Sequence, residues 1–451
     1  MPQVPNAHLT QLLNEADWKP SQLAVAIRSV AREHGDHLVC SPSTVGRWLT
    51  GTQPRPPAPV YLLEALSRRL GRPLTAAEAG LTMAPPAPPH ASWEADPVRT
   101  LSALTRSELD PRRRKTVTEG AYSLADLHLP DWPQASQASR HTATDSRASG
   151  RQVGHAEVLA AHSVAEFFGR TVQLFGGAHA RATLACYLAT EVTTWLQAPS
   201  SERIHRQLLS EAAQLTVLLG NMCSDAAADS LAQQYHRTGA RLAADGQDAA
   251  TYSIALRVMS SHAQVLGHQS NAFRLAEQAA GAARRSPGSV RSYAFAQLAV
   301  TEAQLHRHRR QSLTYLNLAE RLHTEKDDSP PGPFSNYPLA GLHYQRAGTL
   351  MALGDRTSAI RSLHLSIASR GHSHSRAGAL THACLAEVQL RQGHLEAALS
   401  HWRLFVDDYP TLHSSRAAHH LQTMHQLLRP HHRRRDVQAH LAHAHTLLAA
   451  T

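Results

Sequence analysis

The last two thirds of the chain repeat a helical pattern at a nearly constant interval. From Val153 onward, apolar residues at helical spacing are interrupted at regular positions, and Gly267, Gly354 and Gly393 are each followed by Ala five residues later. Equivalent apolar positions in successive units are 40, 43, 44 and 39 residues apart. Because a helical unit of this length cannot bury its apolar face alone, the sequence predicts an α-solenoid of stacked units over residues 152–451. The equivalent positions are His236, Ala276, Ala319, Leu363 and Trp402.

The composition of the whole chain favours helices throughout. Hydrophobic residues make up 42% of the sequence but aromatic residues only 5%, and Ala and Leu carry most of the apolar content. Both are strong helix formers, and β-branched runs of strand length are scarce. The chain has no run of about 18 apolar residues, no apolar signal core near its start and no CxxC pair among its four cysteines. We therefore expect an all-α protein without a membrane span, located in the cytoplasm.

The spacing of Gly, Ala and Pro in the last full unit resembles the tetratricopeptide repeat (TPR). Gly393 is followed by Ala398 and, seventeen residues after the glycine, by Pro410. The resemblance implies that Gly makes the tight turn between antiparallel helices, that the small Ala lets them approach closely, and that Pro ends the second helix. The units exceed the usual length of about 34 residues, so their helices or loops are longer. We expect about five repeats and a terminal capping pair at residues 414–428 and 437–449.

Residues 1–82 predict a separate small bundle. Four runs of apolar residues at helical spacing end at Pro or Gly, as helices do. The inward positions are Leu9, Leu12, Leu13 and Ala16 in the first run, Leu23, Ile27 and Val30 in the second, Val45, Trp48 and Leu49 in the third, and Leu63, Leu66 and Leu70 in the fourth.

The third run has the clearest helix-start signal. Ser41 is a natural N-cap and Pro42 suits the first helical position. With the apolar positions turned inward, Ser43, Thr44 and Arg47 remain on the outer face. Two short hydroxyl side chains and one guanidinium therefore share one exposed surface.

The stretch 43–51, followed by Pro54, resembles the recognition helix of XRE-type (lambda-repressor-like) helix-turn-helix domains. In such domains this helix enters the major groove, where hydroxyl and Arg side chains reach base edges or phosphates. The resemblance implies that Ser43, Thr44 and Arg47 contact double-stranded DNA. It also places Gln22 and Arg55 where they hold the DNA backbone.

One departure separates this bundle from a tight helix-turn-helix. Leu23 and Ala24 precede Val45 by about twenty residues, whereas that motif has a turn of only 3–4 residues. The loop at 34–40 is therefore an insertion, which either adds a contact to DNA or marks drift away from DNA binding. An ordinary solvated helix face is the simplest alternative for Ser43, Thr44 and Arg47. The net charge of +10 is compatible with an anionic partner but does not identify one.

Residues 83–151 are predicted to connect the two domains. The Pro-rich stretch 83–90 reads as a stiff spacer, and residues 97–127 contain a short helical segment. The stretch 130–151 is rich in Ser, Ala, Thr, Gln and Arg, so we expect a flexible tether. Within the repeats, the Pro-rich loop 327–338 interrupts the array and is expected to be mobile.

The combination of both modules resembles the helix-turn-helix plus tetratricopeptide regulators of actinomycetes, including NsdA-like repressors. It implies a DNA-binding transcriptional regulator with an N-terminal helix-turn-helix bundle and a C-terminal TPR-like α-solenoid that dimerises and binds a peptide, small-molecule or protein effector. The first helices of such repeats line the concave face. The candidate effector contacts on them are Arg257, His262, Gln345 and Arg376, each of which is more simply explained as a surface polar residue.

The sequence contains no recognisable catalytic or metal motif. HExxH, GxSxG, a Walker loop and a dinucleotide fingerprint are all missing from the 451 residues, and the abundant histidines lack Cys or carboxylate partners at the usual ligand spacing. We therefore expect no enzyme activity, no cofactor and no metal site. A scaffold that assembles proteins without binding DNA is the alternative function. The His groups considered were His372/His374, His419/His420 and His440/His443/His445.

Overall fold

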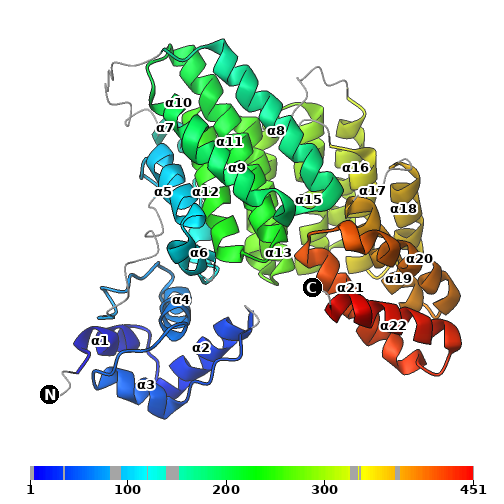
Figure 1. Cartoon of the computed structure of the whole chain (residues 1–451), viewed down its shortest axis with the longest axis horizontal. Coiled ribbons are helices and arrows are strands. Elements are labelled where there is room, and N and C mark those ends of the chain that lie inside the picture. The colour runs from blue at the N-terminus through cyan, green and yellow to red at the C-terminus, as the bar shows by residue number, and fades with distance from the viewer. Residues whose placement is uncertain are drawn as a thin grey trace.

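The computed structural model describes residues 5–33, 36–81, 93–118, 120–138, 152–325, 334, 337–370 and 376–449. Within these ranges every regular element is a helix, which confirms the all-α prediction (Figure 1). No helix there has the length and apolar character that a bilayer crossing requires. The predicted spacer at 83–90, most of the predicted tether at 130–151 and of the loop at 327–338, and the pair His372/His374 lie outside the described residues.

Four helices form the N-terminal bundle. The predicted inward residues pack into one apolar core, with Leu9, Leu23, Ile27 and Val45 fully buried. Gly71 ends the fourth helix in a left-handed conformation with φ 69°, as a C-terminal glycine commonly does. The helices are α1 (Ala7–Glu15), α2 (Pro20–Glu33), α3 (Pro42–Leu49) and α4 (Ala58–Leu70).

Residues 93–118 and 120–138 pack against the repeat array. The sequence predicts instead that they belong to the linker. Leu101, Leu104 and Tyr122 are buried in the same apolar core as the first repeats. The apolar residues of this segment are few, so the sequence pattern is weak, but they pack against several helices of the array. The segment comprises α5 (Pro97–Leu109), α6 (Pro111–Thr118), η1 (Ala125–Leu127) and α7 (Gln134–Ala138).

In the described residues, the repeat array consists of six successive helix pairs, preceded by α8 and four short helices. The five equivalent positions predicted from the sequence all fall in second helices and are buried, as expected. The leading elements are α8 (His155–Phe175), η3 (Gly177–His179), α9 (Arg181–Tyr187), the π-helix η4 (Leu188–Val192) and α10 (Thr193–Gln197). The pairs are α11 (Glu202–Asp225) with α12 (Asp229–Asp245), α13 (Ala249–Val265) with α14 (Gln269–Ala282), α15 (Gly288–Leu305) with α16 (Arg309–His323), α17 (Leu339–Ala352) with α18 (Arg356–Ala368), α19 (Arg376–Arg391) with α20 (Leu395–Asp408), and α21 (Ser415–Leu428) with α22 (Arg435–Ala449).

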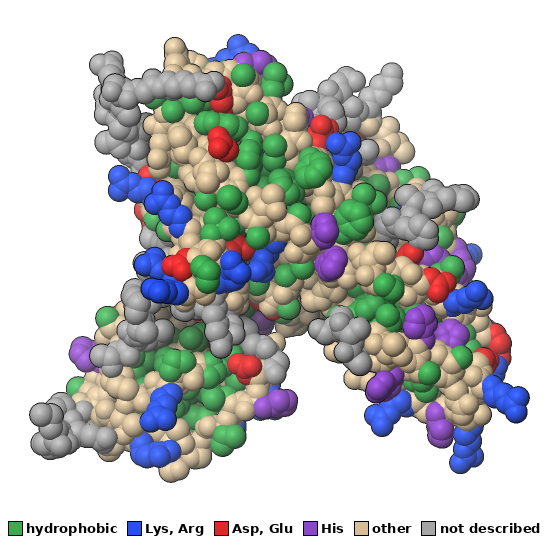
Figure 2. All heavy atoms as spheres, in the orientation of Figure 1, with side chains coloured by type: hydrophobic (Ala, Val, Ile, Leu, Met, Phe, Trp, Pro, Cys, Tyr) green, Lys and Arg blue, Asp and Glu red, His purple; other side chains and the backbone are tan. Residues whose placement is uncertain are grey.

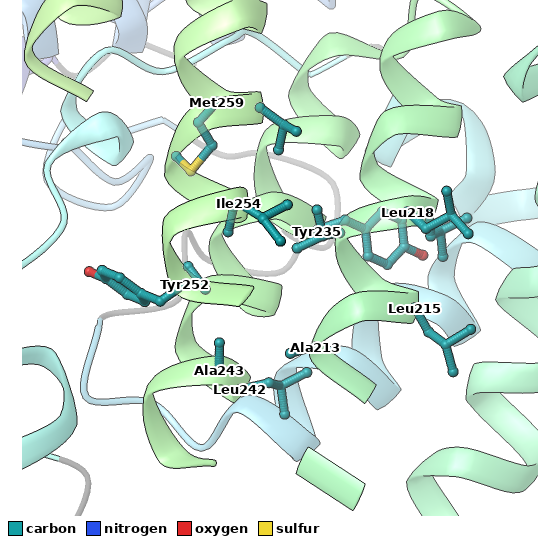
Figure 3. Close-up of a cluster of buried hydrophobic side chains, with 14 of the residues drawn as sticks. Ala213, Leu215, Leu218, Tyr235, Leu242, Ala243, Tyr252, Ile254 and Met259 are labelled. Atoms are coloured by element: carbon teal, nitrogen blue, oxygen red, sulfur yellow. The ribbon is translucent and has the colours of Figure 1, made fainter. Parts of the chain in front are cut away.

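Small residues let the paired helices approach closely. Ala272, Ala359 and Ala398, five residues after each glycine, are fully buried. Ser260 on α13 donates a hydrogen bond of 2.6 Å to the carbonyl of Ala272 on α14, which requires the two backbones to be near each other. Figure 3 shows larger side chains of α11, α12 and α13, including Leu218, Tyr235 and Met259, filling the space between the pairs.

The turn inside each of the first five hairpins uses a left-handed residue. Gly267, Gly354 and Gly393 have φ between 83° and 87°, the region that glycine enters without steric cost. Two other hairpins place Ala227 and Arg307 there, both with φ 57°. The hairpin geometry is therefore shared, although the glycine signal marks only part of the series.

The two ends of the array meet. Asp225, at the end of α11, accepts hydrogen bonds from the Gly177 amide (2.8 Å) and the Ser414 hydroxyl (2.6 Å), and it also pairs with the Arg376 guanidinium. The amide of His413 donates to the carbonyl of Phe175 at 2.7 Å. The residues that join α20 to α21 thus rest on the end of α8, and the array curves back on itself (Figure 1).

Candidate functional site

The outer face of α3 presents the three side chains that the sequence predicts. Ser43 and Arg47 are exposed and Thr44 is half-buried. The hydroxyl of Ser41 accepts a hydrogen bond from the Thr44 amide at 3.2 Å, so Ser41 caps the helix as expected. Arg47 contacts Thr44 Oγ1 at 3.5 Å, with no carboxylate partner among the described residues. This face therefore combines hydroxyls with an unneutralised guanidinium.

The other two predicted DNA contacts flank this face. Gln22 is exposed, but its Oε1 accepts a hydrogen bond of 2.8 Å from the Lys19 amide and so also caps the start of α2. Arg55 is exposed in the turn between α3 and α4. Figure 2 shows Lys and Arg side chains on the visible surface of the bundle, at the lower left.

The described part of the inserted loop is fastened to the bundle. Arg28 on α2 donates a hydrogen bond to the carbonyl of Cys40, and the Tyr61 hydroxyl on α4 donates to Asp36. Since both ends of the described stretch 36–41 are held by neighbouring helices, α3 has a fixed position relative to α2.

The bundle contacts the array through a different side from α3. Glu64 on α4 accepts a hydrogen bond of 3.1 Å from the Leu124 amide, and it also pairs with Arg68 at 2.7 Å. Glu33, at the end of α2, lies 4.0 Å from His268 Nε2 of the array. The exposed face of α3 takes no part in these contacts.

A cavity of about 710 Å³ lies on the inner side of the array. It is lined mainly by α8 and the first helices of the repeats, as expected for a concave face. Three of the four predicted effector residues line it, namely Arg257, His262 and Arg376, whereas Gln345 does not.

Arg257 and His262 are the two predicted residues with unsatisfied polar atoms at this cavity. The Arg257 guanidinium lies 3.8 Å from the ring centre of Tyr293, and its buried Nε has no hydrogen-bond partner. His262 Nε2 lies 2.8 Å from Asp229, while its buried Nδ1 has no partner. Buried polar atoms are normally paired, so these two stand out among the residues that line the cavity.

Gln345 and Arg376 have structural partners instead. Gln345 donates to Gln297 Oε1 at 3.0 Å, and Gln297 donates to Gln264 Oε1 at 2.7 Å, which links three successive first helices by side-chain amides. Arg376 is held by Asp225, where the array closes. Neither arrangement leaves the side chain free to meet an effector.

Sequence reasoning missed two further residues of the cavity. The Tyr337 hydroxyl is buried without a partner, and so is Nδ1 of His236. Burial, together with the neighbouring charge of His262, lowers the pKa of His236 well below its usual value. The sequence marked His236 only as a core position in the repeat, and nothing in the local pattern indicates that its ring reaches the cavity.

The N-terminal bundle is similar to a known protein family. The model of the SP15 N-terminal domain matches residues 9–82, which contain the four helices of the bundle. A comparison with curated proteins finds no match to the chain. The similarity to this family therefore concerns the bundle.

Proposed function

We propose that this protein is a DNA-binding transcriptional regulator whose array senses an effector. The proposal rests on the outer face of α3, where Ser43, Thr44 and Arg47 lie together on a capped helix turned away from the array contacts. Hydroxyl and guanidinium groups on one exposed helix face match the donors that read base edges and phosphates in a major groove. Arg55, just beyond the helix, adds a second cation for the DNA backbone.

A chain of rings joins the effector cavity to the bundle. His262, which lines the cavity, packs edge-on against Tyr122 with ring centres 5.0 Å apart. Tyr122 stacks on His268 at 5.8 Å with nearly parallel planes, and His268 faces Glu33 of α2. An effector that moves His262 therefore shifts a packed group in contact with the DNA-binding bundle, which is a physical route for coupling the two sites.

The test is binding to duplex DNA by the full chain, followed by genome-wide chromatin capture. We compare wild type with Arg47→Ala and with the matched control Arg356→Ala, which removes an exposed Arg from the surface of the array. Loss of a groove contact weakens specific binding by about 1–3 kcal/mol, roughly 5- to 150-fold. The control is expected to enrich the same sites as wild type.

Two outcomes contradict the proposal. The first is duplex binding that is missing or does not weaken as salt is raised, because phosphate contacts release counterions. The second is equal enrichment of the same sites by Arg47→Ala and wild type.

One observation favours a second candidate function, a scaffold that binds proteins. Leu159, Phe167 and Leu174 on α8 are between 42% and 57% exposed and fall on one side of that helix. Exposed apolar residues on one face are typical of protein contacts, including the homodimer that we also propose. Crosslinking and light scattering of a Phe167→Asp variant distinguish the cases. If this variant loses both the dimer and DNA binding, the result supports a dimeric regulator. If it loses other protein partners and the wild type binds no DNA, the result supports the scaffold.

A further inference from the structure

The turn between α15 and α16 gathers one carboxylate and two imidazoles. Glu302, near the end of α15, is only 4% exposed. Its Oε2 lies 3.0 Å from Nδ1 of His306, and its Oε1 lies 3.0 Å from Nδ1 of His308. One ligand atom from each of the three residues lies within 4.8 Å of the others.

The surrounding structure holds these groups in place. Arg307, left-handed with φ 57°, turns the chain so that His308 comes back over the carboxylate. The His306 ring packs edge-on against Phe273 of α14, with centres 4.8 Å apart, and lies nearly parallel to the His308 ring. The imidazoles are thus oriented by packing as well as by hydrogen bonds.

Two carboxylates lie close together at this turn. Glu277 of α14 lies close enough for its carboxylate to repel that of Glu302. Arg307, Arg309 and Arg310 are also at this turn, and Arg309 pairs with Asp355. A divalent cation between the two carboxylates neutralises their mutual repulsion.

We propose that Glu302, His306 and His308 bind Zn²⁺, with the fourth position taken by water or by Glu277. Imidazole and carboxylate are preferred ligands of this ion, and tetrahedral coordination with bonds of about 2.0–2.2 Å brings donor atoms about 3.3 Å apart, close to the spacing found here. The His308 side chain is 69% exposed, which gives the ion a direct path from solvent. Such a site joins the end of one helix to the start of its partner.

The experiment uses the tag-free full chain and Zn²⁺ alone, titrated against a chromophoric chelator. The ligand variant is His306→Ala with His308→Ala. The matched control is His443→Ala with His445→Ala, which removes two exposed imidazoles from α22. We expect wild type and the control to bind one equivalent at least tenfold more tightly than any further zinc, and the ligand variant to lose that equivalent. Glu302→Gln, checked for folding by circular dichroism, is expected to weaken it at least tenfold.

Substitution by Co²⁺ gives an independent readout, because a tetrahedral N/O site absorbs visible light far more strongly than hydrated cobalt. The absorption is expected in wild type and in the control, and is lost in the ligand variant. The proposal is overturned if the ligand variant still binds one equivalent of zinc tightly. It is also overturned if wild type binds all its zinc with the same low affinity, without one tighter equivalent.

Discussion

The bundle and the array use the same side-chain chemistry in opposite ways. In the bundle, Arg47 lies on the surface with a single hydroxyl contact. In the array, Arg376 is largely buried and pairs with Asp225. Sequence reasoning assigned a binding role to both, but only Arg47 remains available for an external partner. The difference shows that an Arg on a predicted outer face indicates a binding site more reliably in a small bundle, where that face meets solvent. In a repeat array the same face can pack against neighbouring helices.

The strongest test of this contrast is Asp225→Ala. It leaves the Arg376 charge without a partner and the Gly177 amide and Ser414 hydroxyl without an acceptor, and breaking such a buried pair costs about 3–5 kcal/mol. Chemical unfolding followed by circular dichroism measures the loss. Amide exchange is expected to rise in α21 and at the end of α8 but not in α2 or α4. The exposed Asp407→Ala is the control, with an expected change within about 0.5 kcal/mol.

Acidification should separate the two regions further. Burial lowers the pKa of His401 to about 4, helped by the nearby charges of His382 and His364, and burial also lowers the pKa of His236 well below its usual value. The folded array therefore holds fewer protons than the unfolded chain between about pH 6.5 and 4. The stability of the folded array is therefore unaffected by these histidines above about pH 6.5, and it decreases as the pH falls below that value.

The thermal midpoint, followed from pH 7 to 4.5, measures that loss. His401→Gln removes one of the titrating groups, so its midpoint should fall less steeply with acid than that of wild type. Identical slopes for the two proteins would contradict the prediction.

The contact between the two regions is tested by Glu64→Ala. This change removes the acceptor for the Leu124 amide and one partner of Arg68, for an expected cost of about 1–3 kcal/mol. Faster exchange of the Leu124 amide and a larger radius in solution scattering report separation of bundle and array. Glu15→Ala removes a surface carboxylate that pairs only within the bundle, with Arg72, and should leave both readouts unchanged.

The smallest expected effect is that of Ser41→Ala, which deletes the cap of α3. Loss of an N-cap costs about 1 kcal/mol, seen as faster amide exchange in α3 with the array unaffected. Ser43→Ala, two residues later and exposed, should keep the helix and change only DNA binding. Equal destabilisation by both variants would show that Ser41 has no special capping role.

The sequence predicted the repeat architecture well because the signal recurs. His236, Ala276 and the three later equivalent positions all lie buried in second helices, since each unit packs against the same kind of neighbour. The segment 93–138 was read as part of a linker because its apolar residues are few, and their positions are explained only by the array helices that they pack against.

Side-chain partners distant in the chain were harder to predict. Arg376 and Asp225 are 151 residues apart, and their pairing depends on the curvature of the whole array. The cluster at Glu302 was not predicted for a different reason. Its carboxylate and His306 are one helical turn apart, but the contribution of His308 depends on a left-handed residue that no glycine marks.

The meeting of Ser414 with Asp225 restricts how this chain can evolve. An open solenoid tolerates gain or loss of a unit, since each unit touches only its neighbours. Here a duplicated hairpin would carry the last pair past the end of α8. A deleted hairpin would leave the last pair too far from α8 to contact it. The number of repeats is therefore set by ring closure, and relatives that keep an acidic residue at the end of α11 and a hydroxyl before α21 should keep the same count.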